Sequence, residues 1–365
     1  MIIRDVIQAL ETLAPPSLQE SYDNSGLLIG SDDQICRGAI ISLDCTEDVV
    51  DEAIQANCNL IIAHHPIVFS GLKRITGSNY IQRVVIKAIQ HQIAIYAIHT
   101  NLDNVFDGVN AMICQKLKLK NTSILSPVAE NLSKLETYIP IDSYDKVAAA
   151  LFEIGVGNIG NYSHASFSTE GIGSFKGNEA SNPVLGEKGK LEYVQEKKFE
   201  SIFPNHLRNL VVKTLFNAHP YEEVAYNITN LLNANNRIGA GMIGNLEHPM
   251  DFDDFLPYLK QNMGAKVIRH TKAIPSKISK VAVCGGSGSF LLKKALEHKA
   301  DVFITGDFKY HEFFDAEDKI VIADIGHYES EQFTKELIFS YLSEKFPTFA
   351  FLLSKIETNP IKYYY

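Results

Sequence analysis

The sequence predicts an α/β protein whose core has a mostly parallel sheet and is split by an inserted ferredoxin-like (PII/CutA-like) α+β domain. Three observations lead to this prediction. Apolar runs alternate with helical patterns in residues 38–119, the same rhythm returns in residues 280–354, and residues 132–233 follow a different order. Strands that alternate with helices at this spacing are typical of βαβ units.

The first part of the chain shows the alternation clearly. Thr46 is a suitable N-cap for the first helix after a strand, and residues 1–15 have the pattern of an amphipathic helix. Asp5 interrupts the apolar run in that segment, which argues against a signal peptide. The expected strands are 38–44, 59–63 and 93–100, and the expected helices are 46–58, 79–92 and 108–119.

The last part of the chain repeats this rhythm. Groups with a chemical role gather in such sheets where strands end and loops begin. The expected strands are 280–286, 301–307, 319–325 and 348–354, and the expected helices are 289–299, 310–318 and 328–345.

The middle of the chain has the order β-α-β-β-α-β, which is the split βαβ pattern of a ferredoxin-like module. Residues 176–190, rich in Gly, Asn and Ser, are expected to form a long hairpin loop. A module of this kind between two α/β parts indicates an insertion, although two consecutive domains after residue 130 remain an alternative. The expected domains are a core in two parts, 1–130 and 236–365, and an insert at 131–235.

Composition limits the classes of partner. The net charge of −9 over 365 residues argues against binding to nucleic acid or to an anionic membrane surface. No apolar run approaches the roughly 18 residues of a membrane span. The five cysteines form no C-x-x-C pair, which indicates reduced thiols and a cytoplasmic location.

Metal-type ligands follow three of the expected strands. His64 and His65 end the run "NLIIAHH", Asp103 lies in "AIHTNLD", and His327 and Glu331 lie in "DIGHYESE". The last two are four residues apart at the start of a helix and therefore share one face. Imidazole and carboxylate together suit Zn²⁺, Mn²⁺ or Fe²⁺, and open positions on paired ions can activate water near neutral pH.

Each of these residues and segments also has an interpretation that involves no metal or ligand. A lone histidine at a strand end is more often a hydrogen-bonded polar group than a ligand, so the metal hypothesis depends on the combination. His99 is expected to orient a ligand. The segment "CGGSGSF" (284–290) fits a tight turn better than a phosphate loop. In "NAHPYEEVAY" (217–226), His219, Tyr221 and Glu222 could contact a small ligand or metal, or simply form a turn.

Five segments together, "AHHPIVFSGLKRI", "AIHTNLD", "CGGSGS", "FITGDFKYHEFFDA" and "DIGHYESE", resemble the family of GTP cyclohydrolase 1 type 2 homologues. The resemblance covers residues 1–130 and 236–365, and the middle is similar to CutA and PII folds. It implies a dinuclear metal centre and a ring-shaped homohexamer, two stacked trimers. The ligands that it implies are His64, His65, Asp103, His327 and Glu331.

The resemblance also implies the activity. The leading hypothesis is a metal-dependent hydrolase acting on a nucleotide or related small molecule, which would open the guanine imidazole ring. The cofactor expected is two divalent ions per subunit, zinc first, with iron and manganese as alternatives. The second hypothesis is a non-enzymatic hexameric metal-binding scaffold or regulator, with the insert as an effector module. The sequence assigns no catalytic residue.

Overall fold

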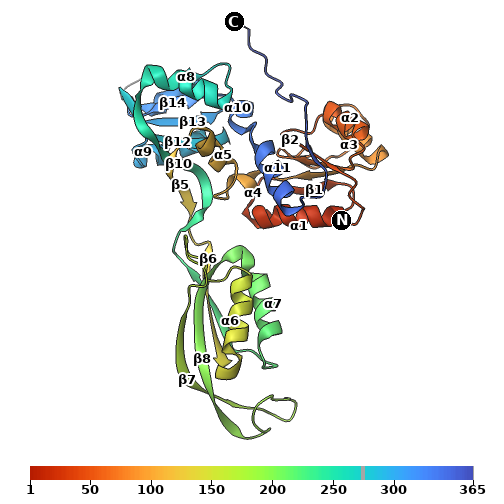
Figure 1. Ribbon diagram of the computed structural model, residues 1–365, viewed down its shortest axis with the longest axis vertical. Coiled ribbons are helices and arrows are strands. Elements are labelled where there is room, and N and C mark those ends of the chain that lie inside the picture. Colours follow the sequence, from red (N-terminus) through yellow and green to blue (C-terminus); the bar gives the residue numbers. More distant parts are fainter. Residues whose placement is uncertain (273–275, 365) are drawn as a thin grey trace. The chain divides into compact units, whose positions relative to one another are not determined.

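The structure, a computed structural model, describes residues 1–272 and 276–364. The chain divides into two compact units. The core unit comprises residues 1–126 and 237–365, and the inserted unit comprises residues 127–236. The core unit contains two mixed sheets with helices on their faces, and the inserted unit contains one antiparallel sheet with two helices (Figure 1). The α/β class with a ferredoxin-like insert, predicted from the sequence, is confirmed.

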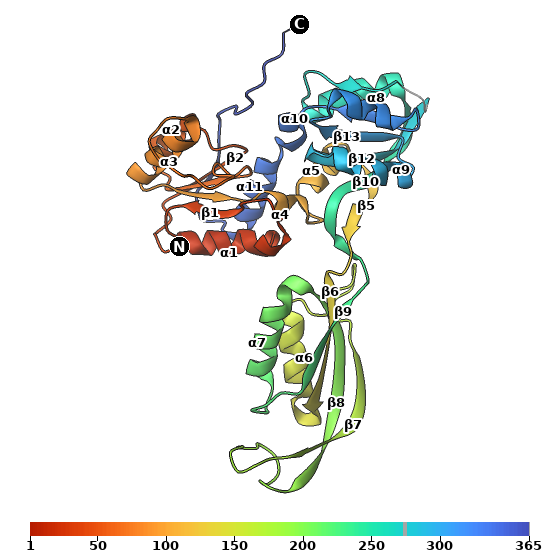
Figure 2. The ribbon, with the colours of Figure 1, turned by 180° about the vertical axis from the view of Figure 1, so that it is seen from behind.

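The first sheet of the core unit has the order β1-β4-β3-β2-β15, with only β1 antiparallel to its neighbour. Its strands are β1 (Gly26–Ile29), β2 (Ala39–Ser42), β3 (Leu60–Ala63), β4 (Ala94–Ala97) and β15 (Phe351–Leu353). Every residue of β2, β3 and β4 is buried, because helices cover both faces. Figure 2 shows α2 (Glu47–Gln55) and α3 (Tyr80–Gln90) on one face, and α1 (Ile3–Leu13) and α11 (Thr334–Lys345) on the other.

The second sheet has the order β11-β14-β13-β12-β10-β5, with β12, β13 and β14 parallel. One face packs on α5 (Val109–Lys116) and α8 (Phe252–Met263), and the other on α9 (Leu292–Glu297). Its strands are β5 (Lys120–Val128), β10 (Asn235–Asp251), β11 (Arg269–His270), β12 (Lys277–Ser287), β13 (Val302–Gly306) and β14 (Val321–Asp324). The parallel strands expected from the sequence are therefore divided between two sheets.

Some elements differ from those expected. The helix predicted over 328–345 is broken at Gln332–Phe333 into α10 (His327–Glu331) and α11. The segment predicted as a helix over 310–318 is the 3-10 helix η5 (Tyr310–Ala316). The short elements that complete the core unit are η1 (Pro16–Leu18), α4 (Thr100–Asp103) and η4 (Ser289–Leu291).

The inserted unit has the sheet order β7-β8-β6-β9, with every pairing antiparallel. Helices α6 and α7 cover one face, where Leu135, Phe199 and Phe203 are fully buried (Figure 2). Its elements are β6 (Leu132–Pro140), η2 (Ile141–Ser143), α6 (Tyr144–Glu153), β7 (Phe167–Lys176), β8 (Leu191–Pro204), η3 (Asn205–Leu207), α7 (Arg208–Ala218) and β9 (Tyr226–Leu231). The order and pairing are those of a ferredoxin-like module.

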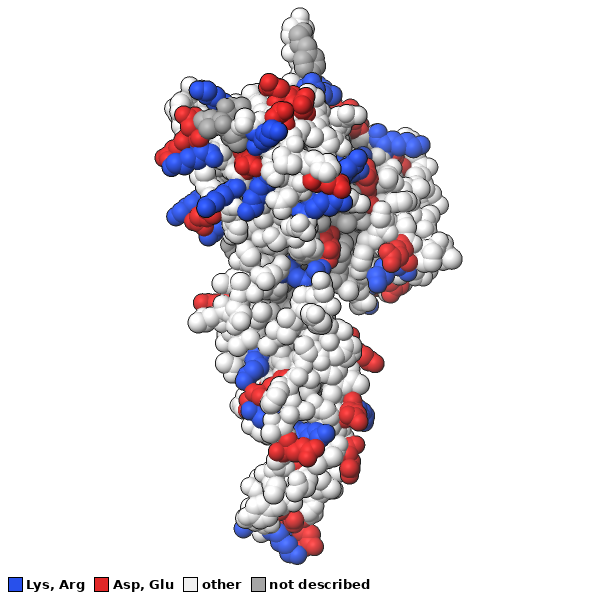
Figure 3. Space-filling model, turned by 60° about the vertical axis from the view of Figure 1, so that its left-hand side comes forward, with Lys and Arg blue, Asp and Glu red and all other residues white. Residues whose placement is uncertain are grey.

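Two features of the surface bear on partners. Across residues 1–272 and 276–364, no helix combines the length and the apolar character that a bilayer crossing requires. On the face drawn in Figure 3, acidic side chains lie among the basic ones. This face therefore carries both signs of charge side by side.

Candidate metal centre

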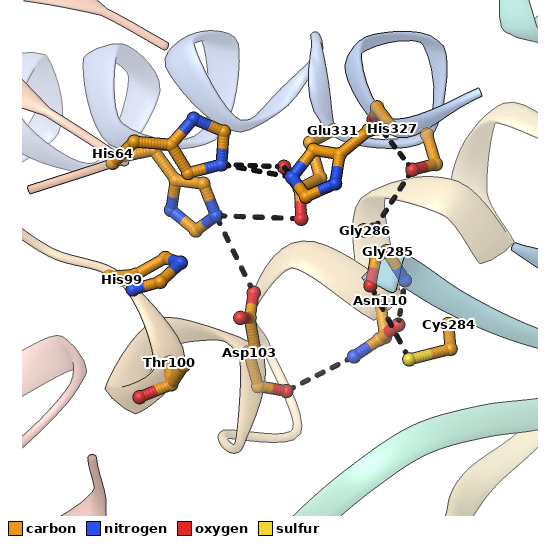
Figure 4. Close-up of polar contacts among 12 residues, drawn as sticks. His64, His99, Thr100, Asp103, Asn110, Cys284, Gly285, Gly286, His327 and Glu331 are labelled. Atoms are coloured by element: carbon orange, nitrogen blue, oxygen red, sulfur yellow. Dashed lines mark hydrogen bonds and ion pairs between the residues drawn. The ribbon is translucent and has the colours of Figure 1, made fainter. Parts of the chain in front are cut away.

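The five residues singled out in the sequence lie together in the core unit. Figure 4 labels four of them, His64, Asp103, His327 and Glu331. His64 and His65 directly follow β3, and Asp103 ends α4, which begins shortly after the neighbouring strand β4. His327 and Glu331 are the first and last residues of α10, which follows β14 of the second sheet. The site therefore forms where strands of both sheets end.

Glu331 joins two sets of donor atoms. Its Oε2 atom lies 2.9 Å from His65 Nε2 and 3.0 Å from His327 Nε2, and these two nitrogens are 3.2 Å apart. Its Oε1 atom lies 3.9 Å from His64 Nε2, which in turn is 3.7 Å from Asp103 Oδ1. In each set the ligand-type atoms all lie within 4.8 Å of one another. One carboxylate thus offers one oxygen to each set.

The hydrogen bonds of His64 identify the ring nitrogen that faces the site. Its Nδ1 lies 2.8 Å from the carbonyl oxygen of Ile98. Because a carbonyl only accepts hydrogen bonds, Nδ1 must carry the proton, and Nε2 presents a lone pair to the cluster. His64 Nε2 and Asp103 Oδ1 are both buried without a hydrogen-bond partner among the described residues. Unpartnered buried polar atoms are costly, so their convergence on one point indicates a ligand there.

The other imidazoles are each held by a carboxylate behind them. In His65, His327 and His99, the Nδ1 atom lies 2.7 Å from a carboxylate oxygen. These carboxylates belong to Asp44, Asp307 and Asp23, respectively. This is the arrangement that orients metal-binding histidines, with Nε2 directed at the ion. His99 also lies in a third donor group, with His64 and His65.

Sequence reasoning missed two of these carboxylates, Asp44 and Asp23. Asp44 had a signal, because it ends the apolar run "GAIISLD" in the same way that His64 follows "NLIIA". Asp307 lies in the segment "FITGDFKYHEFFDA", where the sequence fits either a pocket-lining residue or an acid at the start of a helix. Asp23 lies in an irregular segment before β1, and nothing in its local pattern marks it.

Charge is distributed unevenly in the site. Burial opposes charge on His65 and His327, but the carboxylates beside them outweigh it, raising the pKa of His65 to about 10 and that of His327 to about 11. Burial also opposes charge on Glu331, yet contacts with His327, His64 and His65 hold its pKa well below the usual value. Burial, and then the Glu331 charge, raise the pKa of Asp103 to about 7.

These observations fit a divalent cation. The donors are imidazole nitrogens and carboxylate oxygens, which suit Zn²⁺, Fe²⁺ and Mn²⁺. Donor atoms 2.9 to 3.2 Å apart match neighbouring ligands around an ion with bonds of about 2.0–2.2 Å. The number and identity of the ions do not follow from the donor positions.

The turn "CGGSGS" makes room for the site. A Cβ atom on Gly286, which has φ +63°, would lie 2.3 Å from Glu331 Oε1, and one on Gly285 would lie 3.3 Å from Glu331 Cγ. The N–H of Gly285 donates to Asn110 Oδ1, and that of Gly286 donates to Ser330 Oγ. Because both amides are occupied by protein acceptors, the tight-turn interpretation holds and these two amides are not available to a phosphate.

Replacing Asp44 by asparagine is expected to weaken metal binding about 10- to 100-fold, because His65 loses its charged partner and part of its basicity. Titration of metal-depleted protein with Zn²⁺ against a competing chelator measures the change. Asp48→Asn, on the exposed start of α2, is the matched control and should bind like the parent chain. Equal affinities for Asp44→Asn and the control would contradict the orienting role.

Comparisons with known proteins give matches along almost the whole chain. A family model described as Duf34/NIF3 (NGG1p interacting factor 3) matches residues 1–360. Proteins named "GTP cyclohydrolase 1 type 2 homolog" from Halalkalibacterium halodurans and Bacillus subtilis are 38% identical over 363 residues and 37% identical over 366 residues. These matches cover 98% of this chain and 98% of the first relative, and 99% of this chain and 98% of the second.

Solved structures give the same result. A Bacillus cereus protein described as related to NIF3 superposes with a TM-score of 0.88 at 37% identity, covering 100% of this chain and 99% of that one. A Staphylococcus aureus protein superposes with a TM-score of 0.77 at 31% identity, with the same coverage. From its sequence, its fold and the full-length match to the family model, the chain belongs to the Duf34/NIF3 (NGG1p interacting factor 3) family.

Proposed function

We propose that the chain is a metal-dependent hydrolase that holds two divalent cations per subunit, zinc first, with iron or manganese as alternatives. The ligands would be His64, His65, Asp103, His327 and Glu331. The observation that supports this proposal is the pair of donor sets that share Glu331. The substrate class, a nucleotide whose guanine imidazole ring is opened by water, rests on the name that the relatives bear.

The cations, when bound, would supply Lewis-acid activation of water and of an electron-poor substrate atom. The protein's own residues prepare the site for this. Asp44 and Asp307 fix the rings of His65 and His327, and the Ile98 carbonyl fixes the tautomer of His64. His99, anchored at Nδ1 by Asp23, is placed to hold or pass on a proton at Nε2 beside the other imidazoles.

The test combines metal analysis with turnover. The purified chain, loaded with Zn²⁺, Fe²⁺ or Mn²⁺, is incubated with GTP, other nucleoside triphosphates and a phosphoester, and ring opening and phosphate release are recorded. We expect turnover by the parent chain, with a loss of at least about 10²-fold in His64→Ala. His91→Ala, on an exposed residue at the end of α3, should retain parent activity. Stoichiometric metal without turnover of any substrate would contradict the hydrolase proposal.

The pH dependence of metal binding follows from the raised pKa values. With pKa values of about 10 and 11, His65 and His327 carry protons at pH 7 in the metal-free site. A cation bound at Nε2 must displace them, so affinity falls as the pH falls. We expect release of about two protons per chain above pH 7, and roughly a hundredfold loss of affinity per pH unit between about pH 9 and pH 7. Calorimetry in buffers of different ionisation enthalpy counts the protons, and binding without proton release would contradict this protonation state.

The second candidate is a non-enzymatic metal-binding scaffold or regulator that assembles as a homohexamer of two trimers. The separate core of the inserted unit favours it, because a unit with its own core can respond to an effector. Light scattering should then give six times the chain mass of 40.7 kDa. A metal-dependent change in assembly without turnover would favour this candidate. The five free cysteines, all buried, support a reducing compartment such as the cytoplasm for either function.

A further inference from the structure

The inserted unit contains a cavity of about 730 Å³ that has no role in the proposed metal chemistry. Its lining comes from the distal part of the β7–β8 hairpin, from the loop that joins these strands and from the turn before β9. Figure 2 shows this hairpin and its loop, with α6 and α7 on one face of the sheet. The volume lies in the range of about 300–1,000 Å³ that small-molecule sites occupy.

The cavity lies on the sheet face that the helices leave open. Side chains alternate between faces along a strand, and Phe199 of β8 points into the helical core. Glu196, three residues earlier, therefore points to the opposite face. Gly171 pairs with Glu196 in the β7–β8 register, and Gly173 is on the same face as Gly171. A Cβ atom on Gly171 would meet nothing within 4 Å. Strand β7 thus lacks side chains where the cavity opens.

Glu196 is the buried charged residue among those that line this cavity. Its side chain is largely buried, since the residue is only 8% exposed, and the hydroxyl of Tyr221 donates to Oε1 at 2.9 Å. The other oxygen, Oε2, accepts no hydrogen bond from any described residue. The neighbouring lysines are engaged elsewhere: Lys198 lies 2.8 Å from Glu136, and Lys197 lies 3.5 Å from Glu170. Oε2 keeps some contact with solvent, so it is a free acceptor that a donor group of a ligand in the cavity can reach.

Aromatic rings and a closed rim complete the site. The rings of Phe175 and Tyr221 lie 6.0 Å apart between centroids, and both line the cavity. The N–H of Asn182, in the hairpin loop, donates to Glu222 Oε1 at 2.7 Å and ties the loop to the turn before β9. In that turn both nitrogens of His219 are used, one by the Tyr138 carbonyl and one by the N–H of Tyr221. His219 therefore holds the turn and is not available to a ligand.

We propose that this cavity binds a small molecule with a flat apolar body and a cationic N–H group, such as an aromatic amidine or amine. The rings of Phe175 and Tyr221 contact the body, and Glu196 Oε2 accepts from the N–H group. Charge-assisted hydrogen bonds of this kind are about twice as strong as neutral ones. The site is independent of the metal centre, because each of its lining residues belongs to the inserted unit.

The test uses the full chain with benzamidine as probe and neutral benzamide for comparison, by titration calorimetry and ligand-observed NMR. We expect saturable binding of benzamidine at one site per chain, and binding of benzamide roughly tenfold or more weaker. EDTA should not alter binding, so this result does not depend on the proposed function. Glu196→Gln retains the acceptor for Tyr221 but removes the charge, and should weaken benzamidine roughly tenfold or more.

A matched pair of variants locates the site. Gly171→Leu places a side chain in the open space and should abolish binding, whereas Tyr193→Leu changes a residue of β8 that is 68% exposed, lies on the other face and is not part of the lining, and should not. Absence of saturable binding to the parent chain, or equal binding by Gly171→Leu, would overturn the proposal. So would a change in light-scattering mass in Gly171→Leu without probe binding to the parent, since the cavity would then be an interface between copies.

Discussion

Glu331→Gln is expected to reduce the bound metal from about two ions per chain to well below one. Glu331 supplies one oxygen to each donor set, so a single substitution affects both. A glutamine offers one neutral oxygen in place of two charged ones. The first set then keeps only its two imidazoles, and the second keeps one imidazole and Asp103, so each holds a divalent ion more weakly. Metal analysis of protein purified in parallel with the parent chain measures the loss.

The same substitution should destabilise the metal-free chain. Glu331 is 3% exposed and compensates the charges of His65 and His327, so its removal leaves these part-buried imidazolium groups without their shared partner. Because solvent reaches both rings, we expect a loss of about 1–3 kcal/mol of unfolding free energy, less than the cost of breaking a fully buried pair. Urea unfolding in the presence of EDTA gives this value.

Glu336→Gln is the matched control for this experiment. It lies on α11, only a few residues away, and its half-exposed carboxylate pairs with Lys116 near the surface. Both metal content and stability should stay close to those of the parent chain, within about 0.5 kcal/mol. Parent-like metal content in Glu331→Gln would contradict the shared-ligand arrangement and, with it, the proposed dinuclear site.

Gly286→Ala is expected to have the second-largest effect. The added Cβ would lie 2.3 Å from Glu331 Oε1, and the backbone φ of +63° is one that alanine adopts at a cost. The imidazoles hold the Glu331 carboxylate from the other side, so it cannot move away without leaving the donor sets. Metal affinity should fall at least about tenfold, and unfolding free energy by about 1–3 kcal/mol.

Gly71→Ala separates this effect from a general intolerance of substitution at glycine. Gly71 lies in a loop, and a Cβ there would meet nothing within 4 Å. Competition with a chelator and thermal unfolding should give parent-like values for this variant. If Gly286→Ala binds Zn²⁺ as tightly as Gly71→Ala, the turn does not shape the site.

The sequence by itself determined the local elements and the chemistry of the donors. Strands β2, β3 and β4 are short apolar runs between turn signals, and α2 and α3 begin at side-chain caps on Thr46 and Asn79. These features depend on neighbouring residues, so they can be predicted from the sequence. The five proposed ligands were predicted because imidazoles and carboxylates are unusual near the ends of buried strands. The segments that contain them also resemble a known family.

Only the tertiary structure decided which strands pair and which groups meet. The 17-residue strand β10 is not among the elements expected from the sequence, and it pairs with β12, a strand from a distant part of the chain. Three features arise from residues that are far apart in the chain or in different strands. They are the separate roles of the two Glu331 oxygens, the contact of Asp44 with His65, and the free Oε2 of Glu196. Burial and register create these contacts, and no local pattern of residue types encodes them.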